Sequence, residues 1–173
     1  EAAERTVLTN VLQHSNAQFP STASMRMYLD DLYGTVLYLD TSKKGNEHVV
    51  ILNVETVNDQ YLKNSDVLSK VLELMHTVLF EPNFENGTFK ENIVAREKEM
   101  VKERIQSIFD DKSRYAQNRL TKILAPNHPA SISANGTIPD VEAITLQSLT
   151  DTYQRMLAED VVDIYVVGDI DET

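Results

Sequence analysis

The residues 36-VLYLDTSKKGNEHVVILNVETV-57 decide the fold class of this sequence. Two β-branched, alternating stretches, 36–40 and 48–57, flank the turn-forming residues Lys43-Lys44-Gly45-Asn46. Alternating apolar residues on both sides of such a turn predict two antiparallel strands joined as a hairpin. We expect this hairpin to form the larger part of a small antiparallel sheet.

Helical periodicity surrounds the hairpin on both sides. It predicts helices over residues 2–14, 22–33, 67–79, 87–109, 111–124 and 145–157. The apolar run Val161 to Val167 predicts one more strand, buried in the sheet. Three strands bury this many amphipathic helices only as a sheet with helices on one face. The sequence therefore predicts an α+β fold, a two-layer sandwich with a mainly antiparallel sheet.

The composition is that of one globular domain. The chain has 173 residues, of which 42% are hydrophobic, and 16 Lys+Arg against 27 Asp+Glu give a formal net charge of −11. This acidity argues against nucleic acid as a partner. No cysteine is present, which excludes disulfides, zinc ribbons and thiol nucleophiles. The apolar runs are too short to cross a bilayer, so we expect no membrane partner and a cytoplasmic location.

We expect residues 1–173 to form a single lobe without internal linkers. The sequence opens directly in a helical pattern and closes just after a predicted strand. The predicted sheet is also small for the number of helices. Both features favour a piece of a longer, multi-lobe protein.

Glu97 is the polar residue whose position most needs an explanation. On the predicted helix 87–109, Glu97 and Arg104 fall within a stripe of apolar residues, namely Phe89, Ile93, Met100, Val101, Ile105 and Ile108. A bare buried carboxylate is costly, so Glu97 must be paired or useful. Either it pairs with Arg104 or a neighbouring helix, or it belongs to a ligand site. The histidines offer no alternative, because no two lie within five residues and His14 and His128 fall in predicted loops.

Several short stretches occur in the same order in one known family of proteins. They are 28-YLDDLYG-34, 95-AREKEMVKERI-105, 135-NGT-137, 144-ITLQSL-149 with Tyr153, and 166-VVGD-169. In these stretches the sequence resembles the insulinase/pitrilysin family of zinc metallopeptidases. The stretch 110-DDKSRYA-116 resembles a bacterial branch that works as a two-protein pair, in which one member lacks the zinc motif.

The resemblance implies a degenerate metal site. Active relatives carry H-x-x-E-H on the first helix, followed by Gly-Thr, and a glutamate on a later helix as third zinc ligand. Aligning Gly-Thr with Asn16-Ala17 places Val7 and Val11 at the histidine positions and Asn10 at the base position. Glu97 matches the third ligand. Zinc needs about three protein ligands and an activated water, so the resemblance implies no cofactor and no catalytic residue here.

The leading hypothesis is a catalytically degenerate lobe that pairs with an active lobe or subunit of the family and encloses a peptide substrate. Glu97, Arg104, Arg114 and Tyr115 are the candidate polar residues for structure or peptide contact. One alternative is an active zinc metalloendopeptidase whose ligands come from another segment or chain, so whether the chain is an enzyme stays open. Another is a purely structural scaffold subunit. A further alternative is that the partner of the isolated lobe is a second copy of the same lobe.

Overall fold

The hairpin forms as predicted and one of its faces packs on the core. In the computed structural model, which describes residues 1–63, 66–126 and 128–169, β1 (Val36–Lys44) pairs antiparallel with β2 (Glu47–Glu55). Gly45 adopts φ +60 in the turn between them. Leu37 and Leu39 are buried while Val36 and Tyr38 are exposed, the alternation expected of a half-buried strand. This face of β1 contacts the first helix, α1 (Ala2–His14).

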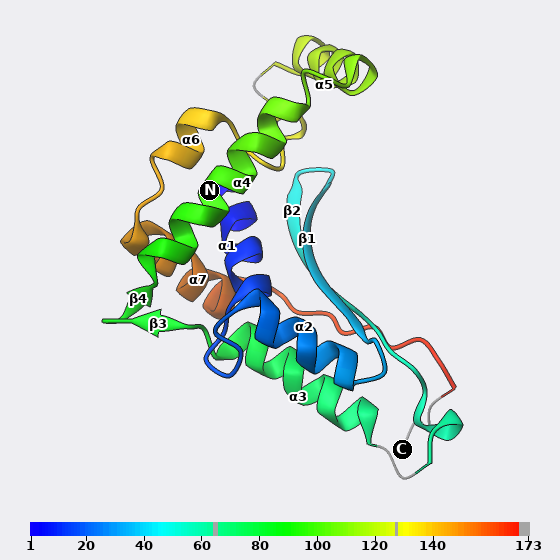
Figure 1. Ribbon diagram of the computed structural model, residues 1–173. Helices are drawn as coiled ribbons and strands as arrows, with labels where there is room; N and C mark the ends of the chain where they lie inside the picture. The colour runs from blue at the N-terminus through cyan, green and yellow to red at the C-terminus, as the bar shows by residue number, and fades with distance from the viewer. Residues whose placement is uncertain (64–65, 127, 170–173) are drawn as a thin grey trace.

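Helices make up most of the rest of the chain (Figure 1). They are α2 (Thr22–Asp31), α3 (Val67–Phe80), α4 (Glu91–Ser107), α5 (Lys112–Leu124), α6 (Ile138–Glu142) and α7 (Leu146–Glu159), with short 3-10 turns η1 (Asp59–Tyr61) and η2 (Pro129–Ser131). A second small hairpin pairs β3 (Phe84–Glu85) with β4 (Thr88–Phe89). The α+β class with small antiparallel sheets is confirmed. Among the described residues, no helix is both long and apolar enough to cross a membrane.

The first helix, α1, is the centre of the molecule. It contacts β1, α4, α6 and α7, and Figure 1 shows it enclosed between α4 and the hairpin. A helix surrounded in this way buries more than one face. The buried residues of α1 are Ala3, Thr6, Val7, Leu8, Thr9, Asn10, Val11 and Leu12. The residues aligned with the family's zinc motif therefore lie inside the protein.

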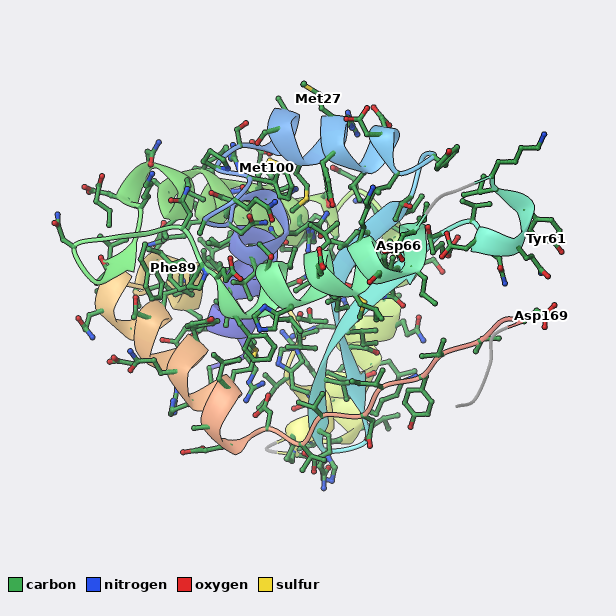
Figure 2. The ribbon with its side chains drawn as sticks, turned by 90° about the horizontal axis from the view of Figure 1, so that it is seen from below. Met27, Tyr61, Asp66, Phe89, Met100 and Asp169 are labelled. Carbon is green, nitrogen blue, oxygen red and sulfur yellow. The ribbon has the colours of Figure 1, made fainter. Side chains whose placement is uncertain are left out.

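An aromatic cluster closes the core at the start of α4. Phe89, labelled in Figure 2, is 1% exposed and makes edge contacts with Phe84 and Tyr153. The Tyr153 hydroxyl donates to the Leu79 carbonyl at 2.8 Å, which satisfies its polar end. Burial raises the pKa of Tyr153 to about 12, so the hydroxyl remains a donor at neutral pH.

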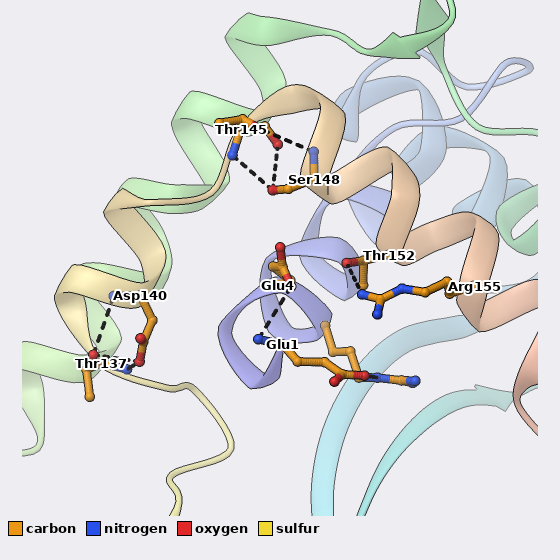
Figure 3. Close-up of polar contacts among 9 residues, drawn as sticks. Glu1, Glu4, Thr137, Asp140, Thr145, Ser148, Thr152 and Arg155 are labelled. Carbon is orange, nitrogen blue, oxygen red and sulfur yellow. Dashed lines mark hydrogen bonds and ion pairs between the residues drawn. The ribbon is translucent and has the colours of Figure 1, made fainter.

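Side-chain caps fix the starts of the later helices. Thr145 and Ser148 form a reciprocal capping box at α7, and Thr137 and Asp140 do so at α6 (Figure 3). Asp111 caps α5 by accepting from the backbone N–H of Arg114 at 2.9 Å. Asp111 and Thr145 stand at the predicted starts of these two helices, and their short side chains satisfy backbone donors that a helix leaves free.

The loop before α6 lies directly against α1. Gly136 has φ +70, and a Cβ added to it would lie 2.8 Å from the Cβ of Ala3. Thr6 of α1 donates to the Ala134 carbonyl at 2.9 Å. Glycine is needed here because the backbone is left-handed and the approach to α1 leaves no room for a side chain.

Two sequence predictions about elements are wrong. Residues 87–89 belong to the turn and second strand of the β3–β4 hairpin, and α4 begins only at Glu91. Asn86 and Gly87 both have positive φ, so the Asn-Gly turn signal outweighed helical periodicity there. The predicted buried strand over 161–167 is exposed and pairs with no strand in the described part of the chain. Its apolar pattern is typical of a strand, but pairing requires a neighbour.

Candidate functional site

Glu97 is buried on α4 and held by two basic side chains. The residue is 1% exposed. Its Oε1 accepts from Arg96 Nε at 2.8 Å and lies 2.6 Å from Arg96 Nη2. Its Oε2 lies 3.2 Å from Nδ1 of His14, the last residue of α1, and neither of these two atoms has another hydrogen-bond partner. Each carboxylate oxygen of Glu97 thus faces one cationic or potentially cationic group.

The partners keep the Glu97 carboxylate charged. Desolvation by burial acts to raise its pKa, but the hydrogen bonds and charges of His14 and Arg96 outweigh it, so the pKa of Glu97 lies below its usual value. Burying a carboxylate is tolerated only with such compensation. The side chains of His14 and Arg96 are 28% and 52% exposed, so the site connects to the surface through its partners.

Val7 and Val11 lie on the same face of α1 as His14. Residues three, four and seven apart share one side of an α-helix, and Val11 and Val7 precede His14 by three and seven positions. Because His14 contacts Glu97 on α4, this face of α1 points toward α4. Val7 and Val11 are both buried in the core cluster that also contains Val94 and Val101 of α4. Asn10, one turn before His14, is 7% exposed.

These residues do not fit a catalytic zinc ion. Valine side chains carry no lone pair, so Val7 and Val11 cannot ligate a metal. A neutral Asn10 cannot take a proton from a bound water. In residues 1–63, 66–126 and 128–169, no group of three or more His, Cys, Asp or Glu side chains is placed to hold a metal. The side chains that face the Glu97 carboxylate are the guanidinium of Arg96 and the imidazole of His14, and in the described part of the chain neither is paired with a second potential metal ligand.

The other candidate residues lie apart from Glu97. Arg104 is exposed, and Glu97 pairs instead with Arg96 and with His14 of the neighbouring helix α1, the second of the two pairings that the sequence left open. Residues seven apart share a side of the helix, but they are separated by about 10 Å along its axis, so Arg104 lies two turns from Glu97 and nearer the end of α4. Arg114 and Tyr115 are exposed on α5, which extends beyond that end of α4 (Figure 1). Tyr115 contacts the ring of Phe109, with centroids 5.4 Å apart.

Sequence reasoning missed His14 and Arg96. His14 was predicted to be a surface residue of a loop, whereas it ends α1 and pairs with Glu97. Its position three residues after Val11 could have revealed it, because that spacing puts it on the face aligned with the zinc motif. Met100, predicted to lie in the buried stripe, is 49% exposed and is labelled at the surface in Figure 2. The predicted buried stripe of this helix therefore included a residue that lies at the surface.

Comparisons with known proteins point to the same family. No family model matches the sequence. The chain is 41% identical over 172 residues to a Bacillus subtilis protein named "Probable inactive metalloprotease YmfF". The match covers 99% of this chain but only 40% of the length of that protein. A crystal structure of a conserved protein from Enterococcus faecalis is similar with a TM-score of 0.91 and 34% identity, again over 40% of its chain.

A more distant structure shares the fold. The crystal structure of a peptidase M16 inactive domain from Pseudomonas fluorescens is similar with a TM-score of 0.67, at 17% identity, over 87% of this chain and 33% of that one. Val7, Asn10 and Val11, which stand at the positions aligned with the zinc motif, are consistent with the word "inactive" in the name of the Bacillus subtilis relative. The chain is thus related in sequence to a protein named as a probable inactive metalloprotease, and it shares its fold with an insulinase-type (M16) inactive domain.

Proposed function

We propose that residues 1–173 form a catalytically inactive, or silent, lobe of a longer insulinase-type protein. This lobe pairs with an active lobe or subunit to enclose a peptide. The observation that carries the proposal is Glu97, which His14 and Arg96 neutralise beside a helix face bearing Val7 and Val11. Such a site has no zinc ligand set and no base. Hydrolysis must come from a partner, and the remaining role for this lobe is to bind and confine the substrate. A cytoplasmic location stays a prediction.

The β1–β2 hairpin supports the peptide-binding part of the proposal. Each strand pairs only with the other among the described residues, which leaves the second edge of each without a neighbouring strand. On β1 the Leu39 N–H donates to Gln13 Oε1 at 3.0 Å, so that edge is partly occupied. An extended peptide can add to such an edge through backbone hydrogen bonds, with side-chain pockets setting its preference. The net charge of −11 favours basic peptides over acidic ones.

Peptide binding by the reconstituted pair tests this role. The probe is a fluorescein-labelled, 12-residue peptide that alternates valine and lysine, and the readout is its fluorescence anisotropy. We expect binding by the chain together with the active subunit that copurifies with it. The matched control is the same peptide with alternate backbone amides methylated, which removes strand pairing and should abolish binding. No binding by either the chain or the pair would reject the proposal and favour a structural scaffold.

Zinc content separates the silent lobe from an active peptidase with borrowed ligands. We expect elemental analysis of the purified chain, incubated with zinc and desalted, to find no stoichiometric metal. Glu97→Ala and the exposed Glu99→Ala serve as the variant and its control on the same helix. If the chain binds stoichiometric zinc, and Glu97→Ala loses this zinc while Glu99→Ala keeps it, the proposal of a silent lobe is rejected.

A further inference from the structure

Helix α5 carries an apolar strip that the described part of the chain leaves uncovered. Ala116, Leu120 and Ile123 follow one another at spacings of four and three residues, which places them on one side of the helix. Leu124, one turn after Leu120, widens this strip. The three large side chains of the strip are each more than half exposed. A contiguous apolar strip on a formed helix marks an interaction surface.

Basic residues border the strip. Lys112 lies four residues before Ala116, and Arg119 lies four residues before Ile123, so both stand beside the apolar side chains. Helix α5 has four basic residues and no acidic one, although the whole chain has a net charge of −11. None of these four basic residues forms an ion pair with any residue that the structure describes. The positive charge of α5 is therefore available to a partner.

The structure holds α5 in place without covering it. Figure 1 shows the helix beyond the end of α4, away from the body of the molecule. Asp111 caps its start, and the turn η2 contacts it from the loop that follows. Lys43 of the β1–β2 hairpin holds this loop, because its Nζ donates to the Pro129 and Ile132 carbonyls. A helix that is already formed and anchored loses less entropy when a partner docks on it.

We propose that α5 is the docking site for an acidic amphipathic helix of the partner lobe or subunit. Apolar residues at spacings of three and four are matched by the same pattern on a second helix, and bordering charges select a helix of opposite sign. The chain spans 40% of the relatives it matches, so a longer protein of that kind has other residues to contribute. The inference rests on the proposed function, because it names the surface through which the lobe binds its partner.

The charge distribution favours an acidic helix over two other occupants. A second copy of α5 would bring four further positive charges against the same strip. An anionic membrane extends beneath the whole lobe, and its surface potential would repel the acidic remainder of the chain. An acidic helix presents its carboxylates to α5 alone. It therefore gains the attraction of Lys112 and Arg119 with the least repulsion from the body.

Binding of a synthetic acidic helix tests the docking site. The probe is a fluorescein-labelled peptide of three heptads with leucine at positions a and d and glutamate at e and g. Its fluorescence anisotropy is measured with the 173-residue chain. We expect binding that Arg119→Glu weakens at least about tenfold, because this variant sets a carboxylate against the glutamates of the probe. The same peptide with lysine at e and g should not bind. No binding of the acidic peptide, or equal binding of the two peptides, would overturn the proposal.

A matched control on the same helix sharpens the test. Arg114 has Gln117 and Asn118 at spacings of three and four, so it lies away from the apolar strip. Arg114→Glu makes the same charge change as Arg119→Glu and should alter the affinity by less than about twofold. Leu120→Asp should abolish binding while circular dichroism shows that the chain is still folded. Equal weakening by the two arginine variants would overturn the proposal, because it would indicate attraction by net charge alone.

Two further measurements examine the other occupants. Cosedimentation with phosphatidylserine vesicles that Arg119→Glu abolishes and Arg114→Glu preserves would assign the strip to anionic lipid, and would overturn the proposal. A dimer in sedimentation velocity that Leu120→Asp abolishes would assign it to a second copy, with the same consequence. The acidic probe differs from the basic peptide used to test substrate binding. Failure here is therefore distinguishable from failure of the proposed function.

Discussion

The neighbouring helices α4 and α5 both have an amphipathic sequence, but they differ in how much of their surface is buried. Both are amphipathic, but α4 buries Ile93, Val94, Glu97 and Val101 against other elements, whereas α5 buries no residue at all. On α5, Leu120, Ile123 and Leu124 are more than half exposed. The difference shows that periodicity reports the presence of an apolar face, while packing depends on whether another element covers it.

Truncating buried and exposed apolar residues should separate the two regions most strongly. Phe89→Ala, at the entry to α4, should cost about 3–5 kcal/mol of unfolding free energy, because it removes a fully buried ring. Leu124→Ala on α5 should change it by less than about 0.5 kcal/mol. Urea denaturation of both variants measures these two changes in unfolding free energy. A large effect of Leu124→Ala would show that α5 is covered in solution.

The glycine next to α1 should be the next most sensitive position. Gly136→Ala combines a left-handed backbone with a contact to Ala3, so we expect a loss of about 2–4 kcal/mol. Gly45→Ala has a similar φ of +60 but nothing within 4 Å of the added Cβ, and should lose only about 1–2 kcal/mol. Thermal and urea unfolding give both values. Equal losses would mean that the loop does not lie against α1.

Glu97→Gln should lower the free energy of unfolding by about 1–3 kcal/mol at neutral pH, because it leaves His14 and Arg96 without their carboxylate partner. The pKa of Glu97 is lower in the folded state than its ordinary value of 4.5. Its stabilisation is therefore complete above the unfolded pKa and is lost as pH falls through the folded pKa. The difference between wild type and Glu97→Gln should shrink below about pH 4.5.

Urea titrations between pH 3 and pH 7 check this dependence. The control is Glu99→Gln on the same helix, where the carboxylate is exposed and pairs with Lys102 at 2.7 Å. That pair should contribute little to stability at any pH, because solvent screens an exposed ion pair. A difference for Glu97→Gln that does not change with pH would show that the pKa of Glu97 is the same in the folded and unfolded states, and a stabilisation by Glu97 that grows as pH falls would show that its carboxyl is protonated in the folded protein.

The helix caps give the smallest expected effects. Thr145→Ala removes the cap of α7, whose face is buried, and should lower global stability by about 0.5–2 kcal/mol. Asp111→Ala removes the cap of α5 and should loosen that helix locally, with little change in global unfolding, because α5 buries nothing. Circular dichroism with urea denaturation detects the contrast. Equal global losses would contradict the independence of α5.

Sequence reasoning located the elements better than the contacts between them. The hairpin, the caps at Asp111 and Thr145, and the unusual position of Glu97 follow from local patterns. The partners of Glu97 did not follow, because His14 lies 83 positions earlier in the chain and meets it only through the packing of α1 on α4. Periodicity indicates which face of a helix His14 occupies, but not which other helix that face contacts.

The amino-acid order by itself determined the α+β class, the starts of α5 and α7 and the absence of imidazole at positions 7 and 11, since these depend on residues close together in the chain. Tertiary structure alone decided that His14 and Arg96 neutralise Glu97, that α5 stays uncovered, and that residues 161–167 remain unpaired among the described residues. Burial and strand pairing depend on which surfaces meet in space, and a local pattern shows only that a surface is available.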